Sequence, residues 1–376
     1  MKQGWEYKKL GEIGNIVTGS TPSTKDESNY SPREYCFVKP SDLPSQRIAL
    51  IEETEYYVSR KGLSQSRVLP TGSVLVSCIG SIGKIGILTK EACSNQQINA
   101  IIPKNDIDSK FIAYSIYAYR FLLESIANAP VVPIINKTDF SKIQIPIPPK
   151  STQLSIVSEL DKINELIRLK KEQLKDYDNL AQSIFYEMFG DPVENEKGWE
   201  VKKLIEVSSL INGRAYKQNE LLNEGKYKVL RVGNFFTNSN YYYSNLELDE
   251  EKYCYKGDLL FAWSASFGAF VWDEGKTIFH YHIWRVLFDE KKLNIYYYKY
   301  LLNTMTSFFM NDVHGIGMVH LTKAGMEQYN VPLPPLPLQH LFAQRIEQIE
   351  HQKSEVTKAI TDLETLLASR MQYWFE

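Results

Sequence analysis

Apolar side chains recur at alternating steps of four and three residues through two long stretches of the chain. In the first stretch only Lys170 interrupts the series, which is Ile156, Leu160, Ile163, Ile167, Lys170, Leu174, Tyr177, Ala181, Ile184 and Met188. Adding 186 to each number gives a second series: Phe342, Ile346, Ile349, Lys353, Val356, Ile360, Leu363, Leu367, Arg370 and Trp374. This seven-residue recurrence is typical of coiled-coil a and d positions and predicts two long helices. About 35 residues at roughly 1.5 Å each gives a length of around 50 Å.

Two packing arrangements fit this pattern. Each helix could pack only on its own domain, or the two helices could pack on each other, which the strict recurrence favours. Each helix would end one half of the chain. Antiparallel pairing would therefore relate the halves by a pseudo-two-fold axis and put one globular domain at each end.

The chain contains an internal duplication. The segment Gly4–Leu10 returns as Gly198–Leu204, Gly72–Leu75 as Gly257–Leu260, and Ile145–Pro149 as Val331–Pro335. Single residues repeat in the same order: Gly19 with Gly213, Lys137 with Lys323, and Gln153 with Gln339. The offset falls from 194 to about 185, so the first half carries extra loop residues before Gly72. So many ordered matches indicate a repeat.

Each copy follows one plan. Short apolar and aromatic runs broken by Gly, Pro, Ser and Asn predict strands and turns. A helical stretch follows near Phe111–Ser125 and Tyr296–Met310, then a proline-rich segment and the long helix. We therefore predict an α+β fold: two similar globular α/β domains, 1–149 and 191–335, separated by two long antiparallel coiled-coil helices, 150–190 and 336–376, with an internal pseudo-two-fold repeat.

Composition places the chain among globular proteins, with 43% hydrophobic and 23% charged residues. It has no apolar run long enough for a membrane span, and the start lacks the apolar core of a secretory signal. Cys36, Cys78, Cys93 and Cys254 form no C-x-x-C pair. They indicate reduced, mostly buried thiols in a cytoplasmic protein.

Charge gives little sign of nucleic-acid binding. The net charge is −2. Residues 1–150 carry 18 basic and 14 acidic side chains, a balance of +4, and residues 191–335 carry 16 and 18, a balance of −2. Many DNA-binding proteins have a clear positive excess, because phosphate neutralisation supplies much of their affinity. If this protein binds DNA, we expect a partner to supply part of the affinity.

The doubled arrangement resembles the specificity subunits of type I restriction–modification systems. The first set of matching segments is Trp5–Leu10 with Gly19, Gly72–Gly83, Asn95–Gln97 and Ile145–Gln153. The second set is Trp199–Leu204 with Gly213, Gly257–Gly268, His280–His282 and Val331–Gln339. No single segment is specific, but together they cover essentially the whole chain in the right order.

The resemblance implies two target-recognition domains, each recognising one half of a bipartite site in double-stranded DNA. It implies that the helices act as spacer and dock two modification (methyltransferase) subunits, which restriction subunits can join. Methyl transfer, ATP hydrolysis and cleavage would then belong to the partners. One alternative is a scaffold that does not recognise DNA. Another is the specificity module of a fused restriction–modification system, whose methyltransferase would need more chain and a cofactor motif.

The first candidate DNA contacts lie in a Gly-rich segment. Gly80–Gly86 superficially resembles a phosphate-binding loop, but its copy lacks the lysine and the flanking glycines, which argues against a nucleotide site. One interpretation is a tight turn between strands. In the other, Ser81, Gly83 and Lys84, with Ser266 and Gly268 in the copy, bring backbone N–H groups and a charge to DNA phosphate.

A second candidate set is planar and polar. Asn95, Gln96 and Gln97 match His280, Tyr281 and His282. Asn and Gln can bond adenine bidentately, and Arg285 could do so with guanine. His280 and His282 would share one strand face, as two metal ligands would need. Asn and Gln at the matching places argue against a metal, and a solvent-facing strand remains an alternative.

Lys137 and Lys323 occupy matching places after Asn136 and Thr322. We expect them to contact phosphate, the alternative being ordinary surface lysines. No Walker-type phosphate loop and no G-x-G-x-x-G motif occurs, so we predict no catalytic residues, no cofactor and no metal.

Overall fold

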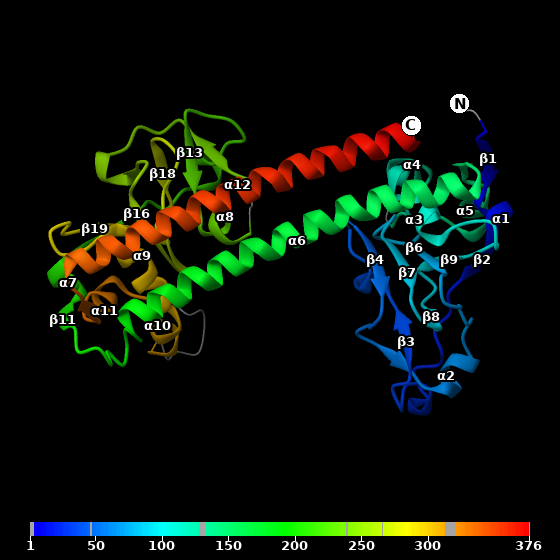
Figure 1. The fold of residues 1–376 in the computed structure, drawn as a ribbon, viewed down its shortest axis with the longest axis horizontal. Coiled ribbons are helices and arrows are strands. Elements are labelled where there is room, and N and C mark those ends of the chain that lie inside the picture. The colour runs from blue at the N-terminus through cyan, green and yellow to red at the C-terminus, as the bar shows by residue number, and fades with distance from the viewer. Residues whose placement is uncertain are drawn as a thin grey trace. The chain divides into compact units, whose positions relative to one another are not determined.

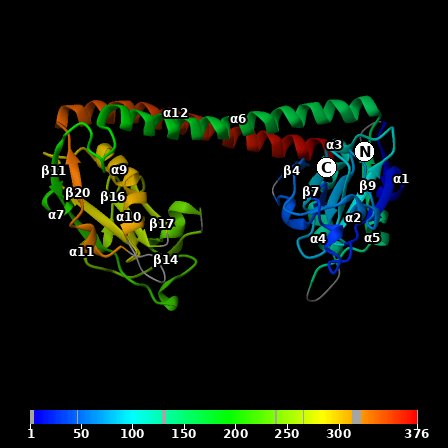
Figure 2. The same cartoon turned by 90° about the horizontal axis from the view of Figure 1, so that it is seen from below.

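The computed structural model describes residues 4–45, 47–127, 132–237, 240–264, 266–312 and 321–375. It divides the chain into two compact units. The first unit holds residues 1–170 and 359–376, and the second holds residues 171–358. Each unit is a mixed α/β domain with segments of both long helices along one side of it (Figures 1 and 2).

The first unit contains three sheets. The largest has five strands in the order β2 (Gly14–Thr18), β9 (Ile98–Pro103), β6 (Val74–Ser77), β7 (Ile85–Leu88) and β4 (Ile48–Ile51). The second has the order β5 (Tyr57–Val58), β3 (Tyr35–Val38) and β8 (Ala92–Ser94), and the third pairs β1 (Glu6–Lys9) with β10 (Gln144–Ile147). All pairings are antiparallel except β4 with β7 and β3 with β8.

The second unit repeats this plan. Its first sheet has the order β12 (Ser208–Asn212), β19 (Ile283–Phe288), β16 (Leu259–Ser264) and β17 (Ser266–Val271). Its second has the order β14 (Tyr242–Ser244), β13 (Tyr227–Leu230), β18 (Thr277–Phe279) and β15 (Tyr253–Cys254), and β11 (Glu200–Lys203) pairs with β20 (Asn330–Leu333). The pairing of β13 with β18 is parallel, like that of β3 with β8. The internal repeat is therefore a repeat of sheet topology, with β4 as the extra strand of the first unit.

Short helices complete each copy. In the first unit they are α1 (Leu10–Ile13), α2 (Arg60–Ser64), α3 (Ser109–Ala118), α4 (Arg120–Ile126) and α5 (Lys137–Lys142). In the second they are α7 (Leu204–Val207), α8 (Val232–Phe236), α9 (Ile295–Thr304), α10 (Thr306–Asp312) and α11 (Lys323–Met326). The helical stretch predicted in each half is thus two helices, broken at Tyr119 and at Met305.

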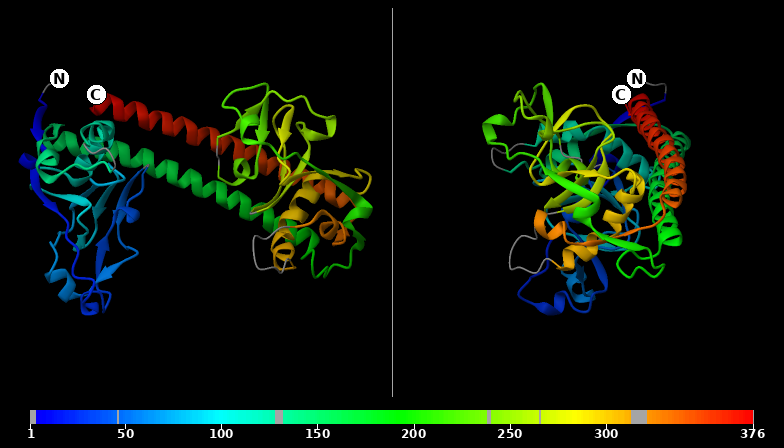
Figure 3. Two further views of the ribbon diagram at one scale, coloured as in Figure 1. Left: turned by 180° about the vertical axis from the view of Figure 1, so that it is seen from behind. Right: turned by 90° about the vertical axis from the view of Figure 1, so that its left-hand side faces the viewer.

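In the first unit, β3, β5 and α2 lie beyond the five-stranded sheet on the side away from the long helix, whereas β4 between them returns to that sheet; the left panel of Figure 3 shows this part in blue. Chain-reversing single-turn 3-10 helices, Glu27–Asn29 and Pro40–Asp42, flank β3. This extension holds the extra loop residues that the changing offset predicts before Gly72.

The long helices are α6 (Lys150–Phe189) and α12 (Leu336–Phe375), each of 40 residues. Pro149 and Pro335 stand just before their first turns, where a missing N–H costs nothing. Gly190, with φ +77°, follows the last residue of α6 and donates its N–H to the Tyr186 carbonyl. That left-handed conformation favours glycine and ends the helix.

A buried glutamine fixes the start of each long helix to its domain. Gln153 accepts from the Asp108 N–H at 2.9 Å and donates to the Pro148 carbonyl at 3.0 Å. Gln339 accepts from the Asn294 N–H at 2.8 Å and donates to the carbonyls of Lys292 at 2.9 Å and Pro334 at 2.8 Å. Both side chains are almost fully buried, so they replace water for backbone groups that would otherwise be unpaired.

The predicted a and d positions are buried or half-buried throughout. In the second unit Asp178 of α6 meets Lys353 of α12, whereas Phe185 and Phe189 meet Phe342. Numbers rise along one helix as they fall along the other, so the pairing is antiparallel. In the first unit Leu367 and Trp374 of α12 pack on the core that contains Ile156 and Leu160 of α6. The predicted fold class is confirmed.

Candidate nucleic-acid interface

Two N–H groups of the β6–β7 turn are paired within the turn itself. The N–H groups of Gly83 and Lys84 donate to the carbonyl and hydroxyl oxygens of Ser77, at 2.9 Å each. Gly83 has φ +79° and is buried against α4, and Lys84 Nζ donates to the Pro40 carbonyl at 3.2 Å. The segment is therefore a tight turn between strands, and the N–H groups of Gly83 and Lys84 are already paired within it. Ser81 is exposed at the turn.

The matching residues of the second unit are not in a turn. Ser266 and Gly268 lie in β17, paired with Ser264 and Ala262 of β16. Gly268 is buried, and a Cβ there would stand 3.2 Å from the ring of Phe236. The Gly268 backbone is therefore less accessible than expected, and half-buried Ser266 lies at the start of the strand.

Asn95–Gln97 forms a turn between β8 and β9, and the strand alternative is wrong. The Ile98 N–H donates to the Asn95 carbonyl at 3.2 Å, which closes the turn. Asn95 is buried, and its side chain forms hydrogen bonds within the turn. Its Oδ1 accepts from the Gln97 N–H at 3.1 Å, and its Nδ2 donates to Gln97 Oε1 at 2.8 Å. Gln96 is exposed and Gln97 half-buried, so they are the amides that a ligand can reach.

His280–His282 forms the equivalent turn between β18 and β19. The Ile283 N–H donates to the His280 carbonyl at 3.0 Å, and His280 Nδ1 accepts from the His282 N–H at 3.4 Å. His280 therefore does what Asn95 does in the first unit. Tyr281 occupies the place of Gln96 and is 38% exposed, and half-buried His282 occupies that of Gln97.

The electrostatic surroundings keep the His280 ring neutral. Burial, aided by the positive potential of His282 and Arg231, lowers the pKa of His280 to about 4. A neutral ring can accept the turn hydrogen bond at Nδ1, which an imidazolium cannot. The ring centroids of His280 and His282 are 4.8 Å apart. In the described ranges, no three or more His, Cys, Asp or Glu side chains gather as a metal site would require.

Arg285, the residue expected to contact guanine, is mostly buried in the second unit. Its side chain on β19 is 14% exposed, donates from Nη1 to the Tyr253 carbonyl at 2.8 Å, and lies 3.6 Å from Asp258 Oδ2. The Nε is buried and has no hydrogen-bond partner among the described residues. The guanidinium is therefore held mostly inside the second unit by groups of that unit.

Lys137 and Lys323 are the first residues of the short helices α5 and α11. Each follows directly on the N-cap residue of its helix, Asn136 and Thr322 respectively. Both lysines are exposed. Lys323 Nζ lies 3.7 Å from Glu327, whereas Lys137 has no ion pair within the part of the chain that the structure describes. Lys137 is thus the better placed of the two for an anion.

The sequence analysis did not predict that the glycines at 19 and 213 pack against the two turns, Asn95–Gln97 and His280–His282. In the first unit Gly19 donates its N–H to the Ile98 carbonyl at 2.9 Å, and a Cβ at Gly19 would stand 2.1 Å from the Asn95 carbonyl oxygen. In the second, Gly213 is equally close to the carbonyls of Phe279 and His280. Only glycine permits this approach. The repeated Gly19 and Gly213 were the available signal for it.

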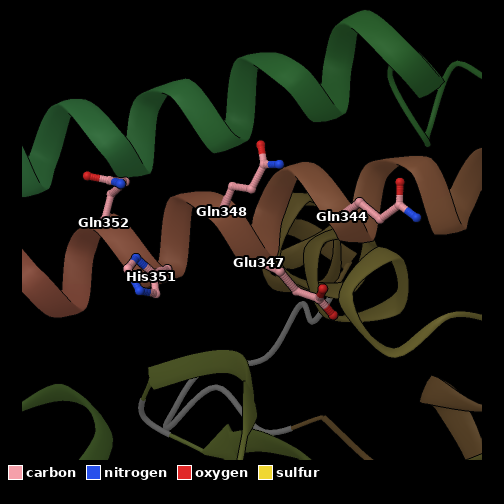
Figure 4. A pocket seen from close by; sticks show the side chains of 5 residues that line it. All are labelled: Gln344, Glu347, Gln348, His351 and Gln352. Carbon is pink, nitrogen blue, oxygen red and sulfur yellow. The ribbon is translucent and has the colours of Figure 1, made fainter.

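Two shallow hollows lie on the surface of the second unit. One, of about 460 Å³, lies over α12 and is lined by Gln344, Glu347, Gln348, His351 and Gln352; Figure 4 shows these side chains spread along the helix. Another, of about 480 Å³, includes Asp258, Glu290 and His340. Within the described ranges, no helix is apolar over enough length to span a membrane.

Comparison with known proteins identifies the family. The type I restriction modification DNA specificity domain matches residues 2–176 and again residues 196–365. The two matches together cover most of the chain, one in each half. The protein belongs to this family of specificity subunits.

Individual relatives agree with this assignment. The chain is 28% identical over 248 residues to the MjaIX specificity subunit of Methanocaldococcus jannaschii, covering 61% of this chain and 57% of that protein. It is 27% identical over 216 residues to the HindI specificity subunit of Haemophilus influenzae, covering 56% and 42%. These two matches span about half the length of the relatives. The MjaVIII specificity subunit of M. jannaschii is 23% identical over 97% of this chain and 92% of that protein.

Two solved structures share the fold. One is a type I restriction–modification S subunit from M. genitalium, with a TM-score of 0.57 and 13% identity over 99% of this chain and 96% of that one. The other comes from work on complex assembly and conformational transition of the type I system. Its TM-score is 0.60, with 16% identity over 99% of this chain and 97% of that one.

Proposed function

We propose that this chain gives a type I restriction–modification complex its DNA sequence specificity. Each α/β domain, with boundaries near 1–149 and 191–335, recognises one half of a bipartite site in double-stranded DNA. The observation that carries this proposal is the pair of equivalent turns: the same backbone frame presents Gln96 and Gln97 in one domain and Tyr281 and His282 in the other. Different side chains on one frame are expected when two domains recognise different half-sites.

The long helices, 150–190 and 336–376, provide the spacer between the half-sites and dock two methyltransferase subunits, which restriction subunits can join. Methyl transfer, ATP hydrolysis and cleavage belong to these partners, and the chain acts in the cytoplasm. Family membership supports this division of labour, and the four free, buried cysteines suit a reducing compartment.

The residues proposed to contact DNA are a reduced set of those expected from the sequence. The side chains proposed to contact base edges are those of Gln96, Gln97 and His282. The residues proposed to contact the DNA sugar–phosphate backbone are Ser81, Ser266, Lys137 and Lys323. Asn95 and His280 support the turns rather than touch DNA, because their side chains accept hydrogen bonds within them.

The test is a gel shift of the chain, assembled with its methyltransferase partner, against a mixture of genomic fragments. Retention of a defined subset of fragments is expected. Equal retention of all fragments would instead favour the scaffold alternative. Incubating the chain alone with labelled S-adenosylmethionine and DNA should transfer no methyl groups above a heat-inactivated control, since transfer is proposed to lie in the partners.

A further inference from the structure

A basic side chain lies at an equivalent position in each domain. Arg67 donates from Nη1 to the Thr18 carbonyl at 2.6 Å, and Lys252 donates from Nζ to the Asn212 carbonyl at 3.0 Å. Thr18 and Asn212 are equivalent, since each ends a strand immediately before the glycine that packs on the turn. Arg67 and Lys252 are equivalent as well. Each stands two residues before a residue that pairs with β8 or β18.

The two cations differ in their surroundings. Lys252 lies 2.9 Å from Glu251, and its side chain is 24% exposed. Arg67 is exposed, and no carboxylate comes within ion-pair distance of it in the described part of the chain. A guanidinium has five N–H donors. The bond to Thr18 holds it in place while its charge and other donors stay available to an anion.

The segment that holds Arg67 also holds Gln96. Ser20 Oγ accepts from the Arg67 N–H at 3.1 Å, and the Ser20 N–H donates to the Ser94 carbonyl at 2.8 Å. Thr21 Oγ1 donates to Gln96 Oε1 at 2.7 Å. Residues 18–21 therefore form hydrogen bonds with both Arg67, which has no ion-pair partner in the described part of the chain, and the exposed amide of Gln96.

We propose, resting on the proposed function, that Arg67 contacts a DNA phosphate beside the base that Gln96 recognises, that Thr21 positions the Gln96 amide, and that Lys252 makes no phosphate contact. An amide can bond a base edge in the major groove, and an arginine can fix the register of the protein on the neighbouring backbone. Lys252, neutralised by Glu251, keeps only the role of supporting the Asn212 carbonyl.

The repeat supplies a matched control for Arg67. Arg67→Ala and Lys252→Ala each remove the hydrogen bond to the equivalent carbonyl, so their effects on the local fold are comparable. Only Arg67→Ala removes a counterion-releasing contact. Each phosphate contact contributes about 0.9 to the slope of log affinity against log salt concentration on duplex DNA.

The first experiment uses the complete complex with its methyltransferase partner, and DNA carrying the site found by mapping methylated positions. Binding is measured between about 50 and 200 mM salt. We expect Arg67→Ala to weaken binding to all sequences alike and to lower the slope by about 0.9. We expect Lys252→Ala to leave the slope unchanged. An unchanged slope for Arg67→Ala, or an equal fall for Lys252→Ala, overturns the assignment.

The second experiment measures discrimination between the intact site and sites with one altered half. Gln96→Ala should reduce discrimination at one half-site by roughly 5- to 150-fold and leave the other intact. Thr21→Val should reduce it at the same half-site, whereas Thr21→Ser, which keeps the hydroxyl, should restore it. The matched control is Gln144→Ala, an exposed amide on β10 of the same unit.

Two failures are distinguishable. A wild-type complex without any sequence preference overturns the proposed function and this inference with it. A selective wild-type complex whose Gln96→Ala and Thr21→Val variants discriminate as well as wild type overturns the inference and the base contact of Gln96, and leaves the sequence specificity of the chain standing.

Discussion

At the scale of single residues, one structural task is done by different chemistry in the two copies. Asn95 and His280 both accept a backbone N–H two residues ahead and so close equivalent turns. Asparagine does so at any pH, whereas histidine does so only while its ring is neutral. The depressed pKa of His280 is consistent with this demand.

This difference predicts a pH dependence of stability. Because the pKa of His280 is lowered from 6.5 to about 4, its contribution to folding is complete above pH 6.5 and is lost as the pH falls toward 4. His280→Asn should keep the turn and flatten the fall in unfolding free energy over that range. Urea unfolding at pH 7.5 and pH 5 checks this, and an equal loss in wild type and variant would contradict it.

The buried glutamines give a second prediction at this scale. Gln339→Ala leaves the Asn294 N–H and the carbonyls of Lys292 and Pro334 without a partner. We expect a loss of roughly 2–4 kcal/mol in unfolding free energy, measured by chemical denaturation. Gln344→Ala, an exposed position on the same helix, is the control. A loss no larger than that of the control would show that water replaces the side chain.

At the scale of elements, polar pairs accompany the apolar contacts of the long helices. In the first unit Arg370 of α12 makes a two-point contact with Glu159 of α6 through Nε and Nη2, and Trp374 Nε1 donates to the same carboxylate at 3.0 Å. The hydrogen bond from Arg370 lowers the pKa of Glu159. In the second unit Lys353 lies 2.7 Å from Asp178 and 3.5 Å from Glu350. The repeat does not place these pairs at equivalent positions.

These pairs should favour one register of the helices over others. A double-mutant cycle of Glu159→Gln and Arg370→Met should give a small favourable coupling in unfolding free energy, because both groups are about one-third exposed and solvent screens them. The same cycle on Glu165 and Arg168, which pair within α6, should give less. Coupling indistinguishable from zero at Glu159 and Arg370 would mean that packing alone sets the register.

At the scale of the whole molecule, the boundary between the two units falls inside both long helices, at 170–171 and 358–359. An insertion or deletion in the long helices at these boundaries changes the length of the helical connection and leaves each globular domain unchanged. If the helices set the spacing of the half-sites, as proposed, their length should determine the length of the DNA spacer.

Inserting seven residues, one heptad, into both helices at these points keeps the apolar series in phase and adds roughly 10 Å, or about three base pairs of DNA rise. Methylation mapping should then give the same two half-sites with a longer spacer. Inserting the same heptad into α6 only, which puts the two helices out of step, is the control and should reduce activity. An active doubly lengthened complex with an unchanged spacer would contradict the proposal.

The sequence by itself determined the repeat, the α+β class, the two long helices and the family resemblance. Those features follow from signals that can be identified in the sequence without the structure. They are the seven-residue apolar series from Ile156, the prolines before each long helix, and the repeated glycines at 19 and 213. The antiparallel direction was also predictable, because each helix ends its own repeat.

The tertiary structure alone decided which polar side chains are accessible. Arg285 is drawn inward by Asp258 and the Tyr253 carbonyl, and Gly268 is paired in a strand where its counterpart Gly83 lies in a turn. Arg67 reaches Thr18 across 49 residues of sequence. Burial and such long-range hydrogen bonds depend on which strands become neighbours, and residue type and spacing along one chain do not specify that.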